Sequence, residues 1–372
     1  MSRLLGPAIA AAVLLTVTLA SSRHADAYPQ YTLSRQSTCS ACHVSPAGGG
    51  LLQGMGPFTS EDDSTWGGDG GFLEGKVTLP EWLNVGGDTR FAFGGNDSGG
   101  GFGGAAFPMQ FESYASATKG ALTGYATLGL VRPNEDSVAS IIQTREHWVM
   151  WRPDENGLYV RAGRFMPVYG LRLAEHTFYT RRFGGAPLYG EAYGVGVGWM
   201  SDGLEAHATA FLADRLREST ERGDGVAAYV EKRLTDTIAV GAQGRFADGD
   251  EDQRIQGGVI GKYWLESAKL LLQAEATLTR QSFTADYDRS QFVGQLLGTW
   301  FFKTGFFLDV GLGQYDPDLS LKGQARTSID ANLHWFPWAH GELVLMTRLQ
   351  SLGLGDGGPG SGFTLLQLHY RL

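Results

Sequence analysis

The sequence predicts an all-β protein: a transmembrane antiparallel β-barrel of about sixteen strands, preceded by a short segment of different composition. From Trp82 onward, apolar and polar residues alternate over segments of roughly ten residues, which is the period of half-buried strands. Several apolar faces carry tryptophan or tyrosine at their ends, as at Tyr193 and Trp199, which suits the aromatic belts of a membrane barrel. The segments also have about the 9–11 residues with which a tilted strand crosses a bilayer.

Residues 1–27 are predicted to be a secretory signal peptide. A positive charge at Arg3 precedes an apolar stretch over 4–20, and small residues at 25–27 offer a cleavage site before Tyr28. A membrane anchor is the alternative, but the stretch is short and contains Pro7. The mature chain is therefore expected outside the cytoplasm, in the bacterial outer membrane with its lipid around the barrel. The net charge of −9 argues against nucleic acid as a partner.

Alternation defines each predicted strand of the barrel, which occupies residues 82–372. In 272–279, for example, Leu272 and its apolar partners alternate with Gln273 and other polar residues. A soluble β-sandwich hides its apolar face between two sheets, whereas a barrel turns that face to lipid and keeps the polar face inside. The predicted strands span residues 82–93, 107–119, 121–131, 144–152, 157–165, 192–200, 203–213, 225–234, 237–246, 256–266, 269–279, 291–302, 304–313, 324–335, 338–349 and 362–372.

The links between these strands and the end of the chain also suit a barrel. Short turns such as 234–236 alternate with longer links, which we expect on the outer side of the membrane. The final strand has an apolar or aromatic residue at every second position and resembles the terminal strand of bacterial outer-membrane proteins, with Leu372 where phenylalanine is usual. The longer, acidic or glycine-rich links span 248–253, 281–290 and 355–362.

Residues 28–81 do not follow the strand pattern, and we expect them to form a haem-binding segment, either a plug in the lumen or a periplasmic appendage. Cys39 and Cys42 are the two cysteines of the chain, and His43 follows directly. C-x-x-C-H is the attachment site of a c-type haem: the thiols bind the two vinyl groups and the histidine is the proximal iron ligand. A redox disulfide and a zinc site are the alternatives, but neither a βαβ context nor further ligands lie nearby.

From Tyr28, the sequence YPQY followed by CSACHVSPAGGGLL resembles the N-terminus of fused monohaem cytochrome–porins of the bacterial outer membrane. The resemblance covers about residues 28–56. It implies one covalent haem c, and electron transfer between an extracellular donor or acceptor and a periplasmic c-type cytochrome, in either direction. Iron-oxidising members imply Fe²⁺ as donor. Their haem motif is followed by proline and a G-R ending, whereas this chain continues with Leu51 and Gln53, which departs from the iron-oxidising pattern.

Four residues are candidates for the sixth ligand of the haem iron. We favour His176, because it lies in a long link that can fold into the lumen. Met55 is near the motif in sequence, and His207 and His334 lie on the polar faces of strands. Each histidine can equally be a solvated lumen or loop residue. The arginines that flank His176 could balance the haem propionates; these are Arg172, Arg181 and Arg182.

A second interpretation is a solute or anion-selective porin whose cysteine pair holds no haem. Residues 163–170, followed by Thr177, Tyr179 and Arg181, resemble a stretch of phosphate-selective porins, in which inward arginines form an anion filter. Arginines paired with lumen carboxylates are the structural alternative. A scaffold for external cytochromes is a third possibility. The sequence contains no nucleophile elbow, phosphate loop or H-E-x-x-H motif, so no hydrolytic or transferase site is predicted, and metal oxidase or reductase turnover is left open.

Overall fold

The structure is a computed structural model that describes residues 29–35, 37–97, 102–130, 142–213, 223–285, 287–352 and 360–372. The predicted signal peptide lies outside these residues. Within them the chain forms one antiparallel sheet, which closes into a barrel because β1 pairs with both β2 and β17. The short strands β4 and β5 both pair with β3, so the seventeen strands occupy sixteen positions in the wall.

The strands follow one another around the barrel in sequence order. Their bounds are β1 Leu83–Asp97, β2 Phe102–Lys119, β3 Leu122–Leu130, β4 Ile142–Gln143, β5 His147–Trp151, β6 Gly157–Phe165, β7 Ala192–Ser201, β8 Leu204–Leu212, β9 Gly223–Thr235, β10 Ile238–Gly249, β11 Asp252–Leu265, β12 Leu270–Phe283, β13 Tyr287–Lys303, β14 Phe306–Asp316, β15 Arg326–Trp338, β16 Gly341–Leu352 and β17 Ser361–Arg371. Neighbouring strands are joined by short turns at one end, which we call the short-turn end, and mostly by longer links at the other.

The predicted strands are all present, and β6 has the predicted bounds. Two of the longer links were predicted wrongly. Most of 281–290 belongs to β12 and β13, and 248–253 is a tight turn flanked by the ends of β10 and β11. These strands continue beyond the apolar part of their sequence, because backbone pairing between neighbours does not need an apolar face. Most of the predicted link 355–362 lies outside the described residues.

The wall has the predicted inside-out polarity. Apolar side chains of the strands are exposed on the outer face, as at Val195 with 55% and Ile329 with 54% of the side chain accessible. The alternating polar side chains are buried in the lumen, as at Gln273 with 1% and Ser328 with 0%. This arrangement suits a barrel whose outer face contacts lipid. None of the described helices has the length and apolar character needed to cross a membrane.

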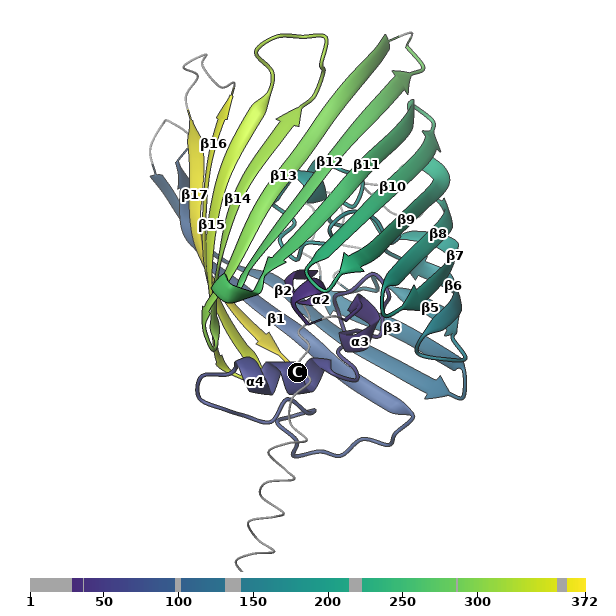
Figure 1. The fold of residues 1–372 in the computed structure, drawn as a ribbon, viewed down its shortest axis with the longest axis vertical. Coiled ribbons are helices and arrows are strands. Elements are labelled where there is room, and N and C mark those ends of the chain that lie inside the picture. The colour runs from purple at the N-terminus through teal and green to yellow at the C-terminus, as the bar shows by residue number, and fades with distance from the viewer. Residues whose placement is uncertain are drawn as a thin grey trace, which may run out of the picture.

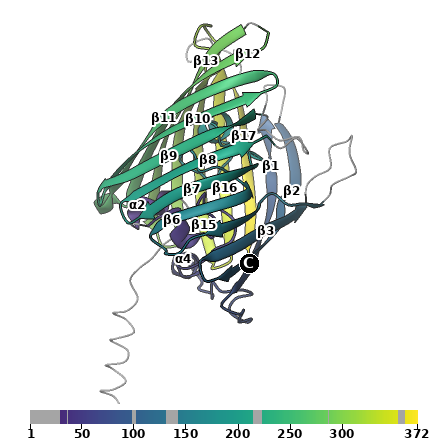
Figure 2. The same ribbon diagram turned by 90° about the vertical axis from the view of Figure 1, so that its right-hand side faces the viewer.

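The remaining elements are short helices: α2 Pro29–Ser34, α3 Cys39–Cys42, α4 Gly56–Asp63, α5 Tyr179–Phe183 and the single-turn η1 Glu266–Ala268. Figure 1 shows α2 and α3 within the short-turn end of the barrel. Both views place α4 beyond the rim at the end where the C-terminus lies (Figure 1, Figure 2). We call the described part of residues 29–63 the N-terminal plug, because most of it is enclosed by the wall.

The lumen is filled by this plug and by the link between β6 and β7, residues 166–191, which we call the lumen loop. Val44 and Leu51 of the plug are buried in one cluster with wall residues such as Tyr114 and Trp148. A second cluster joins residues of the lumen loop, among them Leu171, to wall residues. The hydrophobic core of this protein therefore lies inside the barrel, where the wall is otherwise polar.

Candidate functional site

The C-x-x-C-H motif lies inside the short-turn end of the barrel. Cys39 and Cys42 are the first and last residues of α3, and His43 forms a β-bridge with Leu52 that turns the chain back on itself. All three motif side chains are buried, at 8%, 2% and 4% exposure. Gln53 closes the turn, because its Nε2 donates to the carbonyl oxygen of His43 at 2.9 Å.

The glycine run after the motif is explained by the backbone of this turn. Gly48, Gly49 and Gly50 have φ values of +79°, +72° and +63°, a region in which other residues are strained. At Gly50, an added Cβ would lie 2.5 Å from Oη of Tyr125 on the wall, so the position also requires the absence of a side chain. The glycines thus let the plug turn tightly against β3.

The thiols of Cys39 and Cys42 are not bonded to each other by a disulfide. Burial raises the pKa of the Cys39 thiol, and the nearby guanidinium of Arg172 offsets only part of this effect, so the thiol is protonated at neutral pH. Within the described residues, no cluster of three or more His, Cys, Asp or Glu side chains is arranged to hold a metal ion.

A cavity of about 1090 Å³ lies beside α3 at the short-turn end. Thr38, Ala41 and Met55 are among the plug residues that line it, whereas the motif thiols and His43 are buried and are not among its lining residues. Aromatic side chains of the plug and wall form part of its lining, as do both acidic and basic residues. The charged lining residues are Arg35, Asp63, Glu155, Asp202, Arg233, Glu266, Lys269 and Lys303.

The four candidates for a sixth iron ligand lie in different surroundings. Met55 lines the cavity beside α3, and its backbone N–H donates to the carbonyl of Ala41 at 3.1 Å. His207 faces the lumen but is engaged by Tyr159 at 2.7 Å and Glu205 at 2.8 Å. These contacts occupy both ring nitrogens of His207, whereas Met55 has its side chain at the cavity.

His334 lies on strand β15 of the wall, and His176 lies on the lumen loop. His334 lies between Glu342, at 2.8 Å, and Asp309, at 3.5 Å, on the inner face of the wall. His176 does lie in a link that folds into the lumen, as expected. Burial lowers its pKa to about 4, with further lowering by Arg181 and other arginines, so its imidazole is neutral at pH 7.

The lumen loop is held to the wall by backbone and side-chain bonds. The N–H groups of Gly170 and Leu171 donate to Gln243 at 2.6 Å and to Glu275 at 2.9 Å. Arg172 binds both carboxylate oxygens of Glu205, at 2.6 and 3.0 Å. Gly170 has a φ of +71°, so the chain enters the lumen in a conformation that glycine adopts without strain.

The arginines of the lumen loop and of the neighbouring strand β6 have different partners. Arg172 lies beside Cys39 and also donates to the carbonyl of Pro46 in the plug, at 3.3 Å. Arg164 donates to backbone carbonyls of Thr144 and Arg145 and is 2% exposed. Arg181 is half-buried on the lumen loop, and the carboxylates of Glu191 and Glu275 act on its charge. Arg164 thus binds to the protein itself, as the structural alternative to an anion filter expects.

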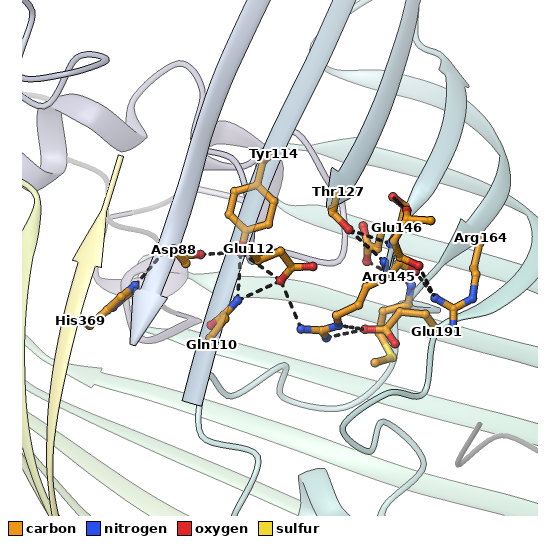
Figure 3. Close-up of polar contacts among 12 residues, drawn as sticks. Asp88, Gln110, Glu112, Tyr114, Thr127, Arg145, Glu146, Arg164, Glu191 and His369 are labelled. Carbon is orange, nitrogen blue, oxygen red and sulfur yellow. Dashed lines mark hydrogen bonds and ion pairs between the residues drawn. The ribbon is translucent and has the colours of Figure 1, made fainter. Parts of the chain in front are cut away.

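A chain of buried acids and bases on the wall was missed by the sequence analysis (Figure 3). His369 Nε2 lies 2.7 Å from Asp88, which accepts a 2.6 Å hydrogen bond from Tyr114. Glu112 lies 3.5 Å from Arg145. Arg145 also forms an ion pair with Glu191 at the end of the lumen loop. The alternation in the sequence indicates that these residues face inward. Which of them pair with each other depends on the register between β17, β1 and β2. The chain ties three wall strands to the lumen loop.

The fold matches solved outer-membrane channels. OmpT of Vibrio cholerae superposes with a TM-score of 0.61 at 11% identity, covering 80% of this chain and 100% of that one. An anion-selective porin from Comamonas acidovorans gives 0.61 at 12% identity, covering 78% and 99%. The outer membrane channel DcaP of Acinetobacter baumannii gives 0.56 at 11%, covering 78% and 97%. No protein-family model and no curated protein sequence matches the chain. The chain therefore shares the barrel fold of these outer-membrane channels.

Proposed function

We propose that this porin-like barrel is an electron-transfer protein with one covalent c-type haem attached to the N-terminal plug. The observation that carries the proposal is the C-x-x-C-H motif on α3, which the plug holds buried inside the barrel. Electrons would pass between an extracellular donor or acceptor, Fe²⁺ among the candidates, and a periplasmic c-type cytochrome. Short turns face the periplasm in outer-membrane barrels, so the plug and the motif are assigned to the periplasmic end.

The donor set fits this haem by its chemistry. Cys39 and Cys42 would form the two thioether bonds and His43 would ligate the iron, and the group when bound supplies one-electron redox chemistry. The 1090 Å³ cavity lies beside the same helix, with Met55 at its lining as a candidate second axial ligand. Of the cations around it, Arg35 is already paired with Asp63, whereas Arg233, Lys269 and Lys303 could bind propionate groups. Because both thiols are buried, we expect attachment to precede the seating of the plug in the barrel.

The packing of the lumen also supports electron transfer over free diffusion of solutes. Apolar side chains of both lumen segments are buried against the wall. The exposed fraction is 3% for Val44 and Leu51 of the plug and 2% for Leu171 of the lumen loop. Such apolar layers close a lumen to hydrated solutes. They also exclude water around a redox group and restrict its exchange with small molecules.

A second candidate is a solute pore with a preference for anions, whose cysteines hold no haem. The comparisons favour this candidate more directly, because the solved neighbours are described as porins and channels, one of them anion-selective. In that case the plug and lumen loop would have to move to let a solute through. The third interpretation, a scaffold for external cytochromes, has no specific observation in its favour.

One experiment separates the candidates. The full chain is produced in a host that matures c-type cytochromes, and the outer-membrane fraction is run on a denaturing gel and stained for haem peroxidase activity. We expect a stained band for the parent and for Ser40→Ala, which changes a variable position of the motif, and no stain for Cys42→Ser. An absorption spectrum of the reduced protein then reports axial ligation, with Met55→Leu as the test variant.

A colourless parent protein that conducts ions in planar bilayers would overturn the haem proposal and support the pore. Intact mass provides an independent measurement, since covalent attachment adds the mass of one porphyrin to the processed chain. A stained protein that conducts no ions in the bilayer supports electron transfer alone.

A further inference from the structure

His340 lies in the turn between β15 and β16 at the short-turn end, and both nitrogens of its ring face backbone carbonyl oxygens. Nδ1 lies 2.6 Å from the carbonyl oxygen of Arg371, and Nε2 lies 2.8 Å from that of Asp69. The histidine is only 3% exposed, so water has little access to the ring. A carbonyl oxygen can only accept a hydrogen bond, so each nitrogen must donate for both contacts to form.

The two contacts can form together in only one protonation state of the ring. The imidazolium has an N–H on both nitrogens, whereas the neutral imidazole has one N–H and one lone pair. In the neutral state one carbonyl would face that lone pair, and its oxygen would lose the hydrogen bond to the ring. Protonation of His340 therefore favours the state in which Arg371 and Asp69 are both bound, and loss of the proton weakens it.

The two carbonyls belong to different parts of the molecule. Arg371 is the last residue of β17, which closes the barrel against β1. Asp69 belongs to residues 64–76, which we call the rim segment. These residues follow α4, the helix that both views place beyond the rim of the barrel (Figure 1, Figure 2). His340 thus connects the segment that leaves the plug to the wall at the position where the barrel closes.

The rim segment has further attachments that do not involve a titrating group. The N–H groups of Thr65 and Trp66 donate to backbone carbonyls at the end of β15, at 3.0 and 2.9 Å. Gly68 packs closely on Ala339, since an added Cβ would lie 3.2 Å from the N and Cβ atoms of Ala339. These contacts hold the start of the rim segment whether or not His340 is protonated, and the bond to Asp69 adds to them.

Several of the charged groups around His340 have other partners. Asp69 accepts from a backbone N–H at 2.7 Å, and Glu342 is bound by two histidines of the wall at 2.8 and 2.9 Å. The carboxylates bind elsewhere, and backbone oxygens occupy both nitrogens of His340. The titratable and charged groups on the elements packed around it are Glu61, Asp62 and Asp63 of α4, Asp69, Glu74 and Lys76 of the rim segment, His334 of β15, Glu342 of β16, Tyr370 and Arg371 of β17 and the terminal carboxylate of Leu372.

We propose that His340 is a pH-sensitive latch, which holds the rim segment and α4 against the barrel when it is protonated and loosens them as the pH rises. The helix α4 shares the latch, because Arg371 donates to the hydroxyl of Ser60 at 2.6 Å and the N–H of Gly70 donates to Glu61 at 2.7 Å. Histidine changes its charge between about pH 5 and 8, so the latch responds to the pH of the solution at this end of the barrel. It does not involve the cysteine motif, so it acts alike in an electron-transfer protein and in a pore.

The test is hydrogen exchange, measured by mass spectrometry on the detergent-solubilised full chain at about pH 5.5 and 8. Each rate is compared with the intrinsic rate at the same pH, which gives a protection factor. We expect the protection of residues 64–71 to fall about tenfold between the two pH values, because one bond to the ring is lost. His340→Gln should show equal protection at both, since an amide does not titrate. His147→Gln changes a histidine of β5 and should keep the tenfold fall.

Two glycine variants test the latch without changing His340. Gly68→Ala places a Cβ 3.2 Å from Ala339 and should move the carbonyl of Asp69 off the ring, so that protection is lower and no longer depends on pH. Gly67→Ala also has a positive φ, +86° against +125° at Gly68, but open space around the Cβ, and should keep the pH dependence. Both positions lie outside the strands, so these variants keep the test decisive if His340→Gln does not fold.

Equal protection of the parent at the two pH values would overturn the latch, as would the same pH dependence in the parent, His340→Gln and Gly68→Ala. Folding of each variant is checked by the mobility shift of the unheated barrel on a denaturing gel. Loss of haem staining would leave the expected exchange unchanged, so failure of the latch and failure of the haem proposal are separate results.

Discussion

Two segments fill the lumen, and the wall holds them in different ways. The lumen loop is covalently continuous with β6 and β7, and its residues bind wall carboxylates and amides, as Arg172 binds Glu205. The N-terminal plug instead accepts hydrogen bonds from wall side chains: Asn84 donates to the carbonyl of Leu52 at 2.6 Å, and Arg161 to the hydroxyl of Ser45 at 3.0 Å. The first segment is tied by charge at many points, the second by single bonds to neutral acceptors.

The difference in bonding suggests that the lumen loop is an integral part of the barrel, whereas the plug is docked into it. A hydrogen bond contributes about 0.5–1.5 kcal/mol between neutral groups and about 1.5–3 kcal/mol where one group is charged, as with Arg161, whereas breaking a buried ion pair costs about 3–5 kcal/mol. We therefore expect the lumen loop to form with the barrel and the plug to seat on a barrel that is already folded. This order also leaves the motif thiols accessible before seating.

The largest expected effect comes from deleting the plug, residues 29–63. The barrel should still fold, because β1 to β17 close without it, and the single-channel conductance should rise from near zero to a measurable value, with the lumen loop still narrowing the pore. Planar-bilayer recording measures the conductance, and the gel mobility of the unheated protein reports folding. A deletion variant that no longer folds would contradict the docked character of the plug.

A smaller effect is expected from Glu205→Gln, which leaves Arg172 buried without its carboxylate. The pair is 5% and 8% exposed, so we expect a loss of about 3–5 kcal/mol in the free energy of unfolding. Urea unfolding in lipid vesicles measures it. The control is Asp288→Asn, which breaks the exposed pair of Arg280 and Asp288 and should cost about 0–1 kcal/mol. Similar losses for the two variants would show that the lumen loop is not anchored by charge.

The smallest expected effect is confined to the plug. Gly50→Ala combines a positive φ with a Cβ placed 2.5 Å from Oη of Tyr125, whereas Gly49→Ala has the positive φ and open space around the Cβ. Left-handed backbone costs about 1–2 kcal/mol for a residue with a side chain. We expect both variants to increase hydrogen exchange over residues 39–56, Gly50→Ala more strongly, with barrel strands unaffected. Equal exchange in both variants would mean that the contact with Tyr125 does not hold the turn.

The register between strands shows why part of the site escaped prediction. Asp88, Glu112 and His369 were each recognisable as inward-facing, since their neighbours alternate. That His369 meets Asp88 follows from β17 pairing with β1, an encounter between residues 281 positions apart. Period-two patterns report which face a side chain occupies and carry no information on its partner across the strand gap. The pairing of these acids and bases therefore could not be predicted from the sequence.

What the sequence determined by itself is the wall: the number and order of strands, the lipid-facing side of each, and the existence of a separate segment with one cysteine motif. Alternation along a single strand suffices for these, because exposure to lipid acts on each residue locally. Only the tertiary structure decided what fills the lumen, how far the strands extend beyond their apolar part, and which charges meet. Those outcomes depend on barrel closure, which brings distant residues together in a water-poor interior, where charge partners and space, rather than hydrophobic pattern, select the contacts.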